Sequence, residues 1–257
     1  MAIVNQVVSG GGSAPAHYIE KAVDANGKLI NTSYFINLIG VTDVGDSVLS
    51  YAYRNNTDIS GAVDMSALTT LSGRNACDSM FVGCTGLTGV NLSSLTTISG
   101  YSACSYMFSG CTGIISVDMP SLTTISGSCA GMFYVCTGLT SVGLSALTTV
   151  SGQYACNGMF YNCTGLMSVD MPSLTTISGN GAFDGMFQRC TSLATVYIGG
   201  TTAIDFGSYT TQFNGMFNNC TQNIDVYAPA ASQSAIESFS GYPNFGGTGT
   251  VTWHWRS

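Results

Sequence analysis

"MFVGCTGLTGVNLSSLTTISG" (residues 80–100) and "MFSGCTGIISVDMPSLTTISG" (residues 107–127) are nearly the same segment written twice. The Phe of this frame recurs six times at nearly constant intervals, and a Cys follows each Phe by three. A weaker copy precedes them, with Tyr53 and Asn56 in the two places. A period between about 20 and 50 residues is typical of stacked repeats, so we expect about seven rungs of one solenoid. The six Phe–Cys pairs are Phe81 and Cys84, Phe108 and Cys111, Phe133 and Cys136, Phe160 and Cys163, Phe187 and Cys190, and Phe217 and Cys220.

The first half of each copy predicts a short strand. In "CTGLTSVGLSALTTV" (residues 136–150), Val142 and Leu144 alternate around Gly143, as in a strand with one buried face. Leu147 and Val150 then lie three apart, which predicts a second extended or 3₁₀ side. A propeller blade needs four strands, and these copies have room for only one good strand, so a solenoid is favoured.

The second half of each copy predicts a short helix. In "QYACNGMFYNC" (residues 153–163), Cys156, Phe160 and Cys163 stand at i, i+4 and i+7, which is one face of two helical turns. The sequence therefore predicts an α/β repeat: a right-handed solenoid with one parallel β-sheet and short helical turns.

The charge of the chain excludes some partners. The net charge is −7, only six residues are Lys or Arg, and charged residues make up 7% of the 257. We therefore expect no nucleic-acid partner, because a basic surface is absent from the sequence. We also expect no membrane insertion, because no apolar run reaches the length of a span. The start, "MAIVNQVVSGGGS", does not have the pattern of a secretory signal.

The frame C-x-x-M-F-x-x-C-T-G-L-T-S-V-D-M-P-S-L-T-T-I-S-G resembles the BspA-like leucine-rich repeats of bacterial surface proteins. The resemblance covers about residues 40–228, and it implies a leucine-rich-repeat solenoid, adhesion, protein binding and a place outside the cell. "IDVYAPAASQSAIESFSGYPNF" (residues 224–245) resembles the segment that closes such arrays, a last strand and a Pro followed by a short helix. "YIEKAVDANGKLIN" (residues 18–31) resembles a virion attachment segment, which suggests a phage-associated relative.

Three regions follow from these observations. Residues 1–37 are expected to form an N-terminal module with a Gly-rich start and a hairpin around "DANGK" (residues 24–28). Residues 38–228 hold the repeats, and residues 229–257 form a C-terminal cap. Within the cap, "TWHWRS" predicts a terminal strand whose Trp side chains pack against the end of the array.

The ten Cys are interpreted as buried thiols. The position four before the Phe is Cys in four copies but becomes Phe183 and Phe213 in the last two, and Asn56 replaces the other Cys in the first copy. A bridged Cys could not be replaced without orphaning its partner, and free Cys behaves as a small hydrophobe. Bridges between adjacent rungs are the alternative. Zinc is disfavoured because the Cys form a column rather than clustered pairs.

Catalysis is not expected. The only His residues are His17 and His254, and neither marks one Cys of the repeating column as a nucleophile. We therefore expect no enzyme, no cofactor and no metal.

Two surfaces are candidate binding sites. The first is the open face of the strands, where one or two residues per rung should point outward. The second is a Tyr cluster among Ser, Gly and Asn, a mixture typical of recognition surfaces. A solvated polar face or a calcium site remains an alternative for the first, and groove filling between rungs for the second. The strand-face residues are Asn91, Ser116, Asp118, Ser168, Asp170, Thr195 and Tyr197. The cluster consists of Tyr101, Tyr106, Tyr134, Tyr154 and Tyr161, of which Tyr106, Tyr134 and Tyr161 are the candidate binding residues.

The sequence thus predicts a non-catalytic binding or adhesion protein that recognises a protein or a glycan through one solenoid face, at a cell or virion surface. The alternative is a structural or assembly component, such as a phage-tail or prophage-encoded virion part, with no independent ligand.

Overall fold

A computed structural model describes residues 2–8, 17–23 and 42–257. Near the N-terminus, β1 (Ala2–Val8) pairs antiparallel with β2 (His17–Val23), in a register that places Ala2 opposite Val23. The hairpin expected around residues 24–28 lies outside the described residues.

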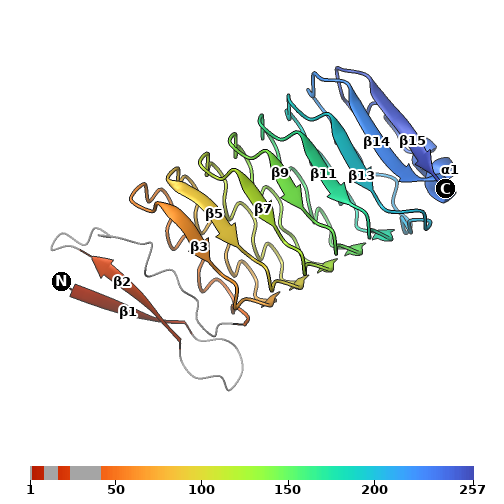
Figure 1. Ribbon diagram of the computed structural model, residues 1–257. Helices are drawn as coiled ribbons and strands as arrows, with labels where there is room; N and C mark the ends of the chain where they lie inside the picture. Colours follow the sequence, from red (N-terminus) through yellow and green to blue (C-terminus); the bar gives the residue numbers. More distant parts are fainter. Residues whose placement is uncertain (1, 9–16, 24–41) are drawn as a thin grey trace.

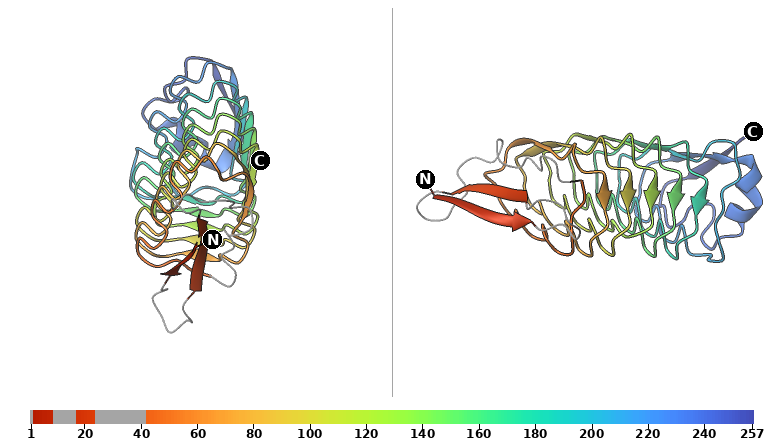
Figure 2. Two further views of the ribbon diagram at one scale, coloured as in Figure 1. Left: turned by 90° about the vertical axis from the view of Figure 1, so that its left-hand side faces the viewer. Right: turned by 90° about the horizontal axis from the view of Figure 1, so that it is seen from below.

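The repeats form an elongated solenoid of about seven turns, which Figure 1 shows from the side. Figure 2 shows the solenoid from its N-terminal end and from below. One long side carries a parallel strand from every turn. These strands are β3 (Gly61–Asp64), β5 (Leu87–Asn91), β7 (Ser116–Asp118), β9 (Ser141–Gly143), β11 (Ser168–Met171), β13 (Thr195–Ile198), β14 (Ile224–Pro229) and β15 (Val251–Arg256). The last six make one sheet, and β3 pairs with β5 beside it.

The predicted solenoid of about seven rungs with parallel strands is confirmed. It differs from the prediction in having more than one sheet, because the short extended side of each copy forms a second parallel ladder. It contains five strands of two residues each, and Thr149 pairs with both Thr124 and Thr176. In each strand the Thr faces outward and the following Leu, Ile or Val is buried, so the backbone groups of this short segment pair with the neighbouring rungs. The strands are β4 (Thr70–Leu71), β6 (Thr97–Ile98), β8 (Thr124–Ile125), β10 (Thr149–Val150) and β12 (Thr176–Ile177).

The prediction of a short helix in each copy was wrong. On this side, which we call the turn side (residues 153–163 and their equivalents), alternate N–H groups donate to the next rung: Cys156 N to Ala182 O at 2.9 Å and Phe160 N to Met186 O at 2.9 Å. The intervening residues donate to the carbonyl three residues back, as Met159 N does to Cys156 O. An α-helix would use its own i−4 carbonyls instead. Bonding between rungs replaces those bonds and ties each turn to its neighbour.

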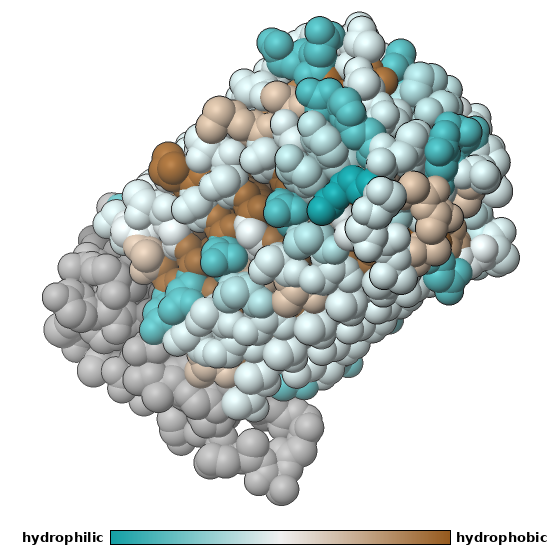
Figure 3. Space-filling view, turned by 45° about the vertical axis from the view of Figure 1, so that its right-hand side comes forward, coloured by the Kyte–Doolittle hydropathy of each residue, from teal (hydrophilic) through white to brown (hydrophobic). Residues whose placement is uncertain are grey.

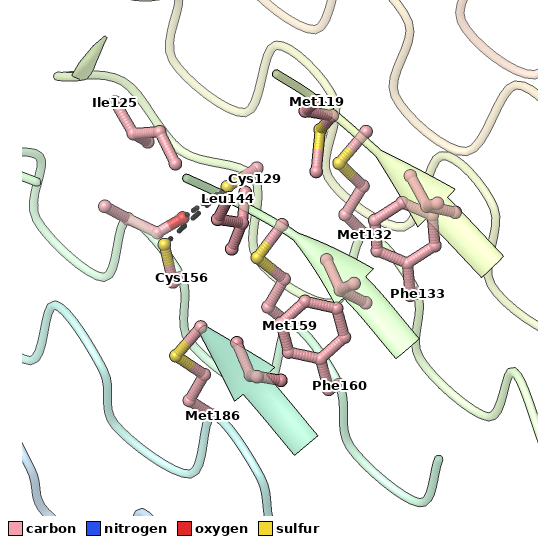
Figure 4. Close-up of a cluster of buried hydrophobic side chains, with 14 of the residues drawn as sticks. Met119, Ile125, Cys129, Met132, Phe133, Leu144, Cys156, Met159, Phe160 and Met186 are labelled. Carbon is pink, nitrogen blue, oxygen red and sulfur yellow. Dashed lines mark hydrogen bonds between the residues drawn. The ribbon is translucent and has the colours of Figure 1, made fainter. Parts of the chain in front are cut away.

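The core contains a column of aromatic rings, to which each rung contributes one ring stacked along the axis. Phe133 lies 5.5 Å from Phe108 and 5.8 Å from Phe160, ring centroid to ring centroid, with planes within 9° of parallel. The column continues from Tyr53 to Phe217 without a break. The prediction that Phe133 and Phe160 contact their equivalents in the middle of the core is confirmed, and Figure 4 shows both rings beside Met132 and Met159.

All ten Cys are free and buried, as predicted. Cys129 Sγ lies 3.9 Å from Cys156 Sγ, a contact drawn as a dashed line in Figure 4. Burial raises the pKa of the Cys111, Cys136 and Cys163 thiols, because the charged thiolate is poorly solvated in the core.

The C-terminal end of the array is covered by the last part of the chain. After β14, Pro229 leads into a 3₁₀ turn (Ala230–Ser232) and the short helix α1 (Gln233–Glu237). The terminal strand expected in "TWHWRS" is β15, and Trp253 and Trp255 pack against the core with their rings stacked 5.7 Å apart.

Candidate functional site

The outward surface of the long sheet, which we call the strand face, consists of two rows of side chains that cross the rungs. One row is fixed by the pairing of each strand with the next, and it runs through Ser116, Ser141, Ser168, Thr195, Asp225 and Thr252. The second row runs through Asp118, Gly143, Asp170, Tyr197, Tyr227 and His254. The structure therefore places six of the seven predicted strand-face residues in two adjacent rows of one sheet, and Asn91 lies in β5 beside it.

The N-terminal half of the strand face is polar and slightly hollow. Asn91, Ser116 and Asp118 line a shallow cavity of about 430 Å³ together with Ala62 and Pro120. Part of this polarity is local, because Asn91 Oδ1 accepts a hydrogen bond from Ser93 N at 3.1 Å. Asp118 leans over Gly143, so that a side chain at Gly143 would collide with its carboxylate. This half therefore offers hydroxyl and carboxylate oxygens but little apolar surface.

The C-terminal half of the same rows is aromatic. Tyr197 and Tyr227 stack with ring centroids 4.6 Å apart, and Tyr227 and His254 stack at 4.6 Å, each pair 16° from parallel. We call these three residues the C-terminal ring ladder. All three side chains are partly exposed. Because they stand on neighbouring strands of one sheet, their positions are fixed by the backbone ladder rather than by a loop.

Charged groups surround the C-terminal ring ladder. His254 Nε2 lies 2.8 Å from Asp225 Oδ1, and both side chains are about half exposed. The Arg256 guanidinium lies 5.8 Å from the Tyr197 ring centroid and donates from Nη1 to Gly199 O at 3.3 Å. Partial burial raises the pKa of Asp170, and the nearby Arg256 charge opposes that rise. Aromatic edges, a carboxylate and a guanidinium thus share one small area.

Sequence reasoning found Tyr197 and Asp170 but missed Tyr227, His254, Asp225 and Arg256. The available signal was the period of two in "IDVYAP" and "VTWHWR", in which Tyr227 and His254 occupy the outward place of Tyr197. The repeat lengthens at the end of the array, where Phe217 comes later than the earlier spacing predicts. The register of these last strands therefore could not be extrapolated from the earlier copies.

Three residues of the predicted Tyr cluster come together on the turn side, whereas among the described residues no ring contact joins Tyr101 or Tyr154 to these three. Tyr134 and Tyr161 stack at 4.5 Å and 3°, Tyr106 meets Tyr134 edge-on at 5.8 Å, and the Arg189 guanidinium lies 5.7 Å from the Tyr161 ring centroid. Burial raises the pKa of the Tyr134 hydroxyl, and the neighbouring Tyr161 adds to the rise. We call Tyr106, Tyr134 and Tyr161 the tyrosine ladder. It is a second, separate surface, because the turn side and the strand face belong to different sides of each rung.

Most of the surface between these features is neither strongly hydrophobic nor strongly hydrophilic. Figure 3 shows a surface that is mostly pale, near the middle of the hydropathy scale, with separate hydrophobic and hydrophilic spots. Within residues 2–8, 17–23 and 42–257, no three His, Cys, Asp or Glu side chains gather as metal ligands would. No helix in the same residues is both long and apolar enough to cross a membrane.

Comparison with known protein families shows which family the repeats belong to. The model of the BspA type leucine rich repeat region matches residues 47–186 and 151–242, with six copies. The chain belongs to this BspA-type family. In this BspA-type array the Phe–Cys frame repeats in six copies, whereas the two ring ladders stand on positions that change from copy to copy.

Other comparisons add little to the BspA-type assignment. No curated protein matches the chain. Among solved structures, a leucine rich cell surface protein from Faecalibacterium prausnitzii is similar, with 14% identity over 83% of each chain and a TM-score of 0.23. A TM-score this low supports no argument about the present protein.

Proposed function

We propose that this BspA-type array is a non-catalytic binding protein that takes a protein or a glycan ligand on its strand face, at a cell or virion surface. The observation that carries the proposal is the C-terminal ring ladder, in which three aromatic rings and the charged groups of Asp225 and Arg256 stand partly exposed on one rigid sheet. Aromatic residues and Arg are enriched where protein surfaces bind partners, because they bury much area at a small cost in conformational entropy.

The chemistry of this surface supports binding rather than catalysis. The His254–Asp225 pair lies on the open sheet, and the ten thiols are buried in the core on the other side of the strands. Affinity would come from several contacts along neighbouring rungs, since each rung offers only one or two outward residues. The net charge is −7 and charged side chains are few, so binding is expected to depend only modestly on the salt concentration.

The test uses the full chain, fluorescently labelled, on a printed glycan array and on a panel of intact bacterial and epithelial cells. One variant replaces Tyr197, Tyr227 and His254 by Ala, and its matched control replaces Tyr106, Tyr134 and Tyr161 by Ala. Loss of signal in the first variant with retention in the control supports the strand face. Loss only in the control would move the site to the tyrosine ladder and overturn the proposal.

A structural or assembly role is the second candidate, and the position of β15 favours it. Among the described residues no strand pairs with the outer edge of β15, which is the edge strand of the six-stranded sheet, and an edge of this kind can pair with a strand of another chain. Light scattering across a range of protein concentrations separates the two candidates. Ordered self-association without binding on the array or the cells would favour assembly.

A further inference from the structure

One rung of the solenoid is shorter than its neighbours. Only Ser128 separates Gly127 from Cys129, whereas three residues separate Gly100 from Cys104 and Gly152 from Cys156. The solenoid continues across this shorter rung, but the two residues that would form one of its corners are missing.

The hydrogen bonds of the turn side absorb the deletion. Tyr106 N donates to Ala130 O in the shortened rung, just as the equivalent Ser79 N donates to Ser105 O one rung earlier. Ala130 and Ser105 both stand three places before the Phe of their rung, so the pairing resumes at the same place of the frame. The loss is therefore confined to the corner that precedes the turn side.

A cavity of about 540 Å³ occupies the missing corner. We call it the notch. It shares no lining residue with the strand face or with the tyrosine ladder, because its lining comes from the first part of the turn side and the corner before it. Its lining residues are Tyr101, Ser102, Ser128, Ala130, Gln153, Tyr154 and Asn157.

Two aromatic rings border the notch, those of Tyr101 and Tyr154. One face of each ring is covered by a residue that does not line the notch. The Arg74 guanidinium, one rung earlier, lies 5.4 Å from the Tyr101 ring centroid. The Tyr154 ring lies over Gly181, one rung later, because a methyl group on Gly181 would fall 2.6 Å from Tyr154 Cδ1 and Cε1. The uncovered faces are therefore those on the side of the shortened rung. Tyr101 is 70% exposed and Tyr154 is 44% exposed, high values for aromatic side chains.

The notch has room for a ligand one ring thick. Tyr101 and Tyr154 stand two rungs apart, and neighbouring strands lie about 4.8 Å apart, so their backbones are separated by roughly 10 Å. Both side chains line the same cavity of about 540 Å³, which is larger than one saturated ring.

The rest of the lining is polar and uncharged. The side-chain amides of Gln153 and Asn157 form no hydrogen bond with any other described residue, so both their donors and their acceptors remain available to a ligand. Ser128 is already used within the protein, since its Oγ donates to Tyr154 O at 3.5 Å and accepts from Ala130 N at 3.3 Å.

We propose that the notch binds one neutral sugar ring between Tyr101 and Tyr154, with the amides of Gln153 and Asn157 bonded to its hydroxyls. The C–H faces of a pyranose pack on aromatic faces, and its hydroxyls match amide groups, which donate and accept. A nucleotide or an acidic sugar would lack a cationic partner among the lining residues. An aromatic peptide side chain would fill the gap but leave the amides without partners. The site does not depend on the proposed strand-face function.

The experiment measures binding of neutral oligosaccharides with terminal glucose, galactose, mannose or N-acetylglucosamine to the full chain, by saturation-transfer NMR and calorimetry. Sialyllactose, adenosine and a Trp-containing tripeptide are the comparison ligands. We expect saturable binding of at least one neutral oligosaccharide, unchanged at high salt. We expect about tenfold or greater weakening in Tyr101→Ala, in Tyr154→Ala and in the double variant Gln153→Ala/Asn157→Ala. Tyr134→Ala, on the same side of the solenoid, should bind like the parent chain.

A second variant tests the notch without removing any lining group. Inserting Ala-Ala between Gly127 and Ser128 restores the three-residue connection of the neighbouring rungs, so it should keep the melting temperature and abolish sugar binding. Three results would each overturn the proposal: no saturable binding of any neutral oligosaccharide, preferential binding of one of the three comparison ligands, or sugar binding that survives both Tyr101→Ala and the insertion.

Discussion

The Sγ of Cys163 lies 3.0 Å from the backbone carbonyl oxygen of Phe133, one rung earlier in the array. The same oxygen accepts the N–H of Cys136 at 3.1 Å, so the thiol is its second donor. This contact recurs in six rungs, in which each Cys donates to the carbonyl of the preceding aromatic anchor: Cys84, Cys111, Cys136, Cys163, Cys190 and Cys220. Cysteine fits this place because it is small, largely apolar and a weak donor.

Burial should make the thiols unreactive in the folded chain. We expect few or none of the ten to react with Ellman's reagent under native conditions, and all ten to react after denaturation without reductant. A buried thiol is inaccessible to the reagent, and burial disfavours the thiolate, which is the reactive form. Fewer than ten reactive groups in the unreduced, denatured chain would show that bridges exist and would contradict the buried-thiol interpretation.

The same burial should make the protein sensitive to alkali. Burial raises the pKa of Cys84 and Cys220 from 9.0 to about 11. Below pH 9 both the folded and the unfolded chain keep these protons, so the stabilisation is fully present. Between pH 9 and about 11 the unfolded chain loses them first, and the free energy of unfolding should fall by about 1.4 kcal/mol per pH unit for each thiol.

Urea unfolding at pH 8, 9, 10 and 11 measures this effect. The variant Cys84→Ala/Cys220→Ala should be less stable at pH 8 but lose stability with a shallower slope above pH 9. An unchanged slope in that variant would mean that other groups cause the alkaline loss.

The aromatic column should dominate the stability of single rungs. Phe160 is fully buried and stacks on Phe133 and Phe187, so Phe160→Ala removes two ring contacts and leaves a cavity. We expect a loss of about 3–5 kcal/mol in the free energy of unfolding, measured by urea denaturation. Met167→Ala is the control, since Met167 is 56% exposed and its loss should change stability by about 0.5 kcal/mol or less. Equal effects of the two changes would contradict the position of the Phe column.

Much of this architecture could be predicted because side-chain identity and period decide it. The Phe–Cys frame fixes the rungs, and the alternation around Gly143 fixes which strand residues are buried. The helix expected over residues 153–163 was wrongly predicted, because buried residues at i, i+4 and i+7 also fit a segment that consists of successive turns. The missed signal was Gly158 and Asn162 in "CNGMFYNC": residues that tolerate positive φ recur every fourth place, at 54° and 57°.

The candidate sites were less predictable, because they depend on irregularities of the repeat. The shortened interval between Phe108 and Phe133 was visible in the sequence, but only the structure shows that the missing residues leave a notch bordered by Tyr101 and Tyr154. The C-terminal ring ladder depends on the register between β13, β14 and β15, which no earlier copy specifies.

The strain at Val135 gives the last test of the turn side. Val135 has φ 60°, in the left-handed region, where a β-branched side chain is strongly disfavoured. Other copies place Gly110, Asn162 or Asn219 at the equivalent position, just before the Cys, with the same sign of φ. Val135 cannot relax, because its N–H donates to Tyr161 O at 2.7 Å in the next rung.

We therefore expect Val135→Asn to raise the free energy of unfolding by about 1 kcal/mol, and Asn162→Val to lower it by about the same amount, in urea denaturation at pH 7. The two variants control for each other, because they exchange the same two residue types at equivalent places of adjacent rungs. If the segment were helical, Val and Asn would differ little in backbone preference at these positions, and neither change would move the transition in this way. A loss of stability in Val135→Asn would mean that the apolar contacts of Val135 outweigh its backbone strain.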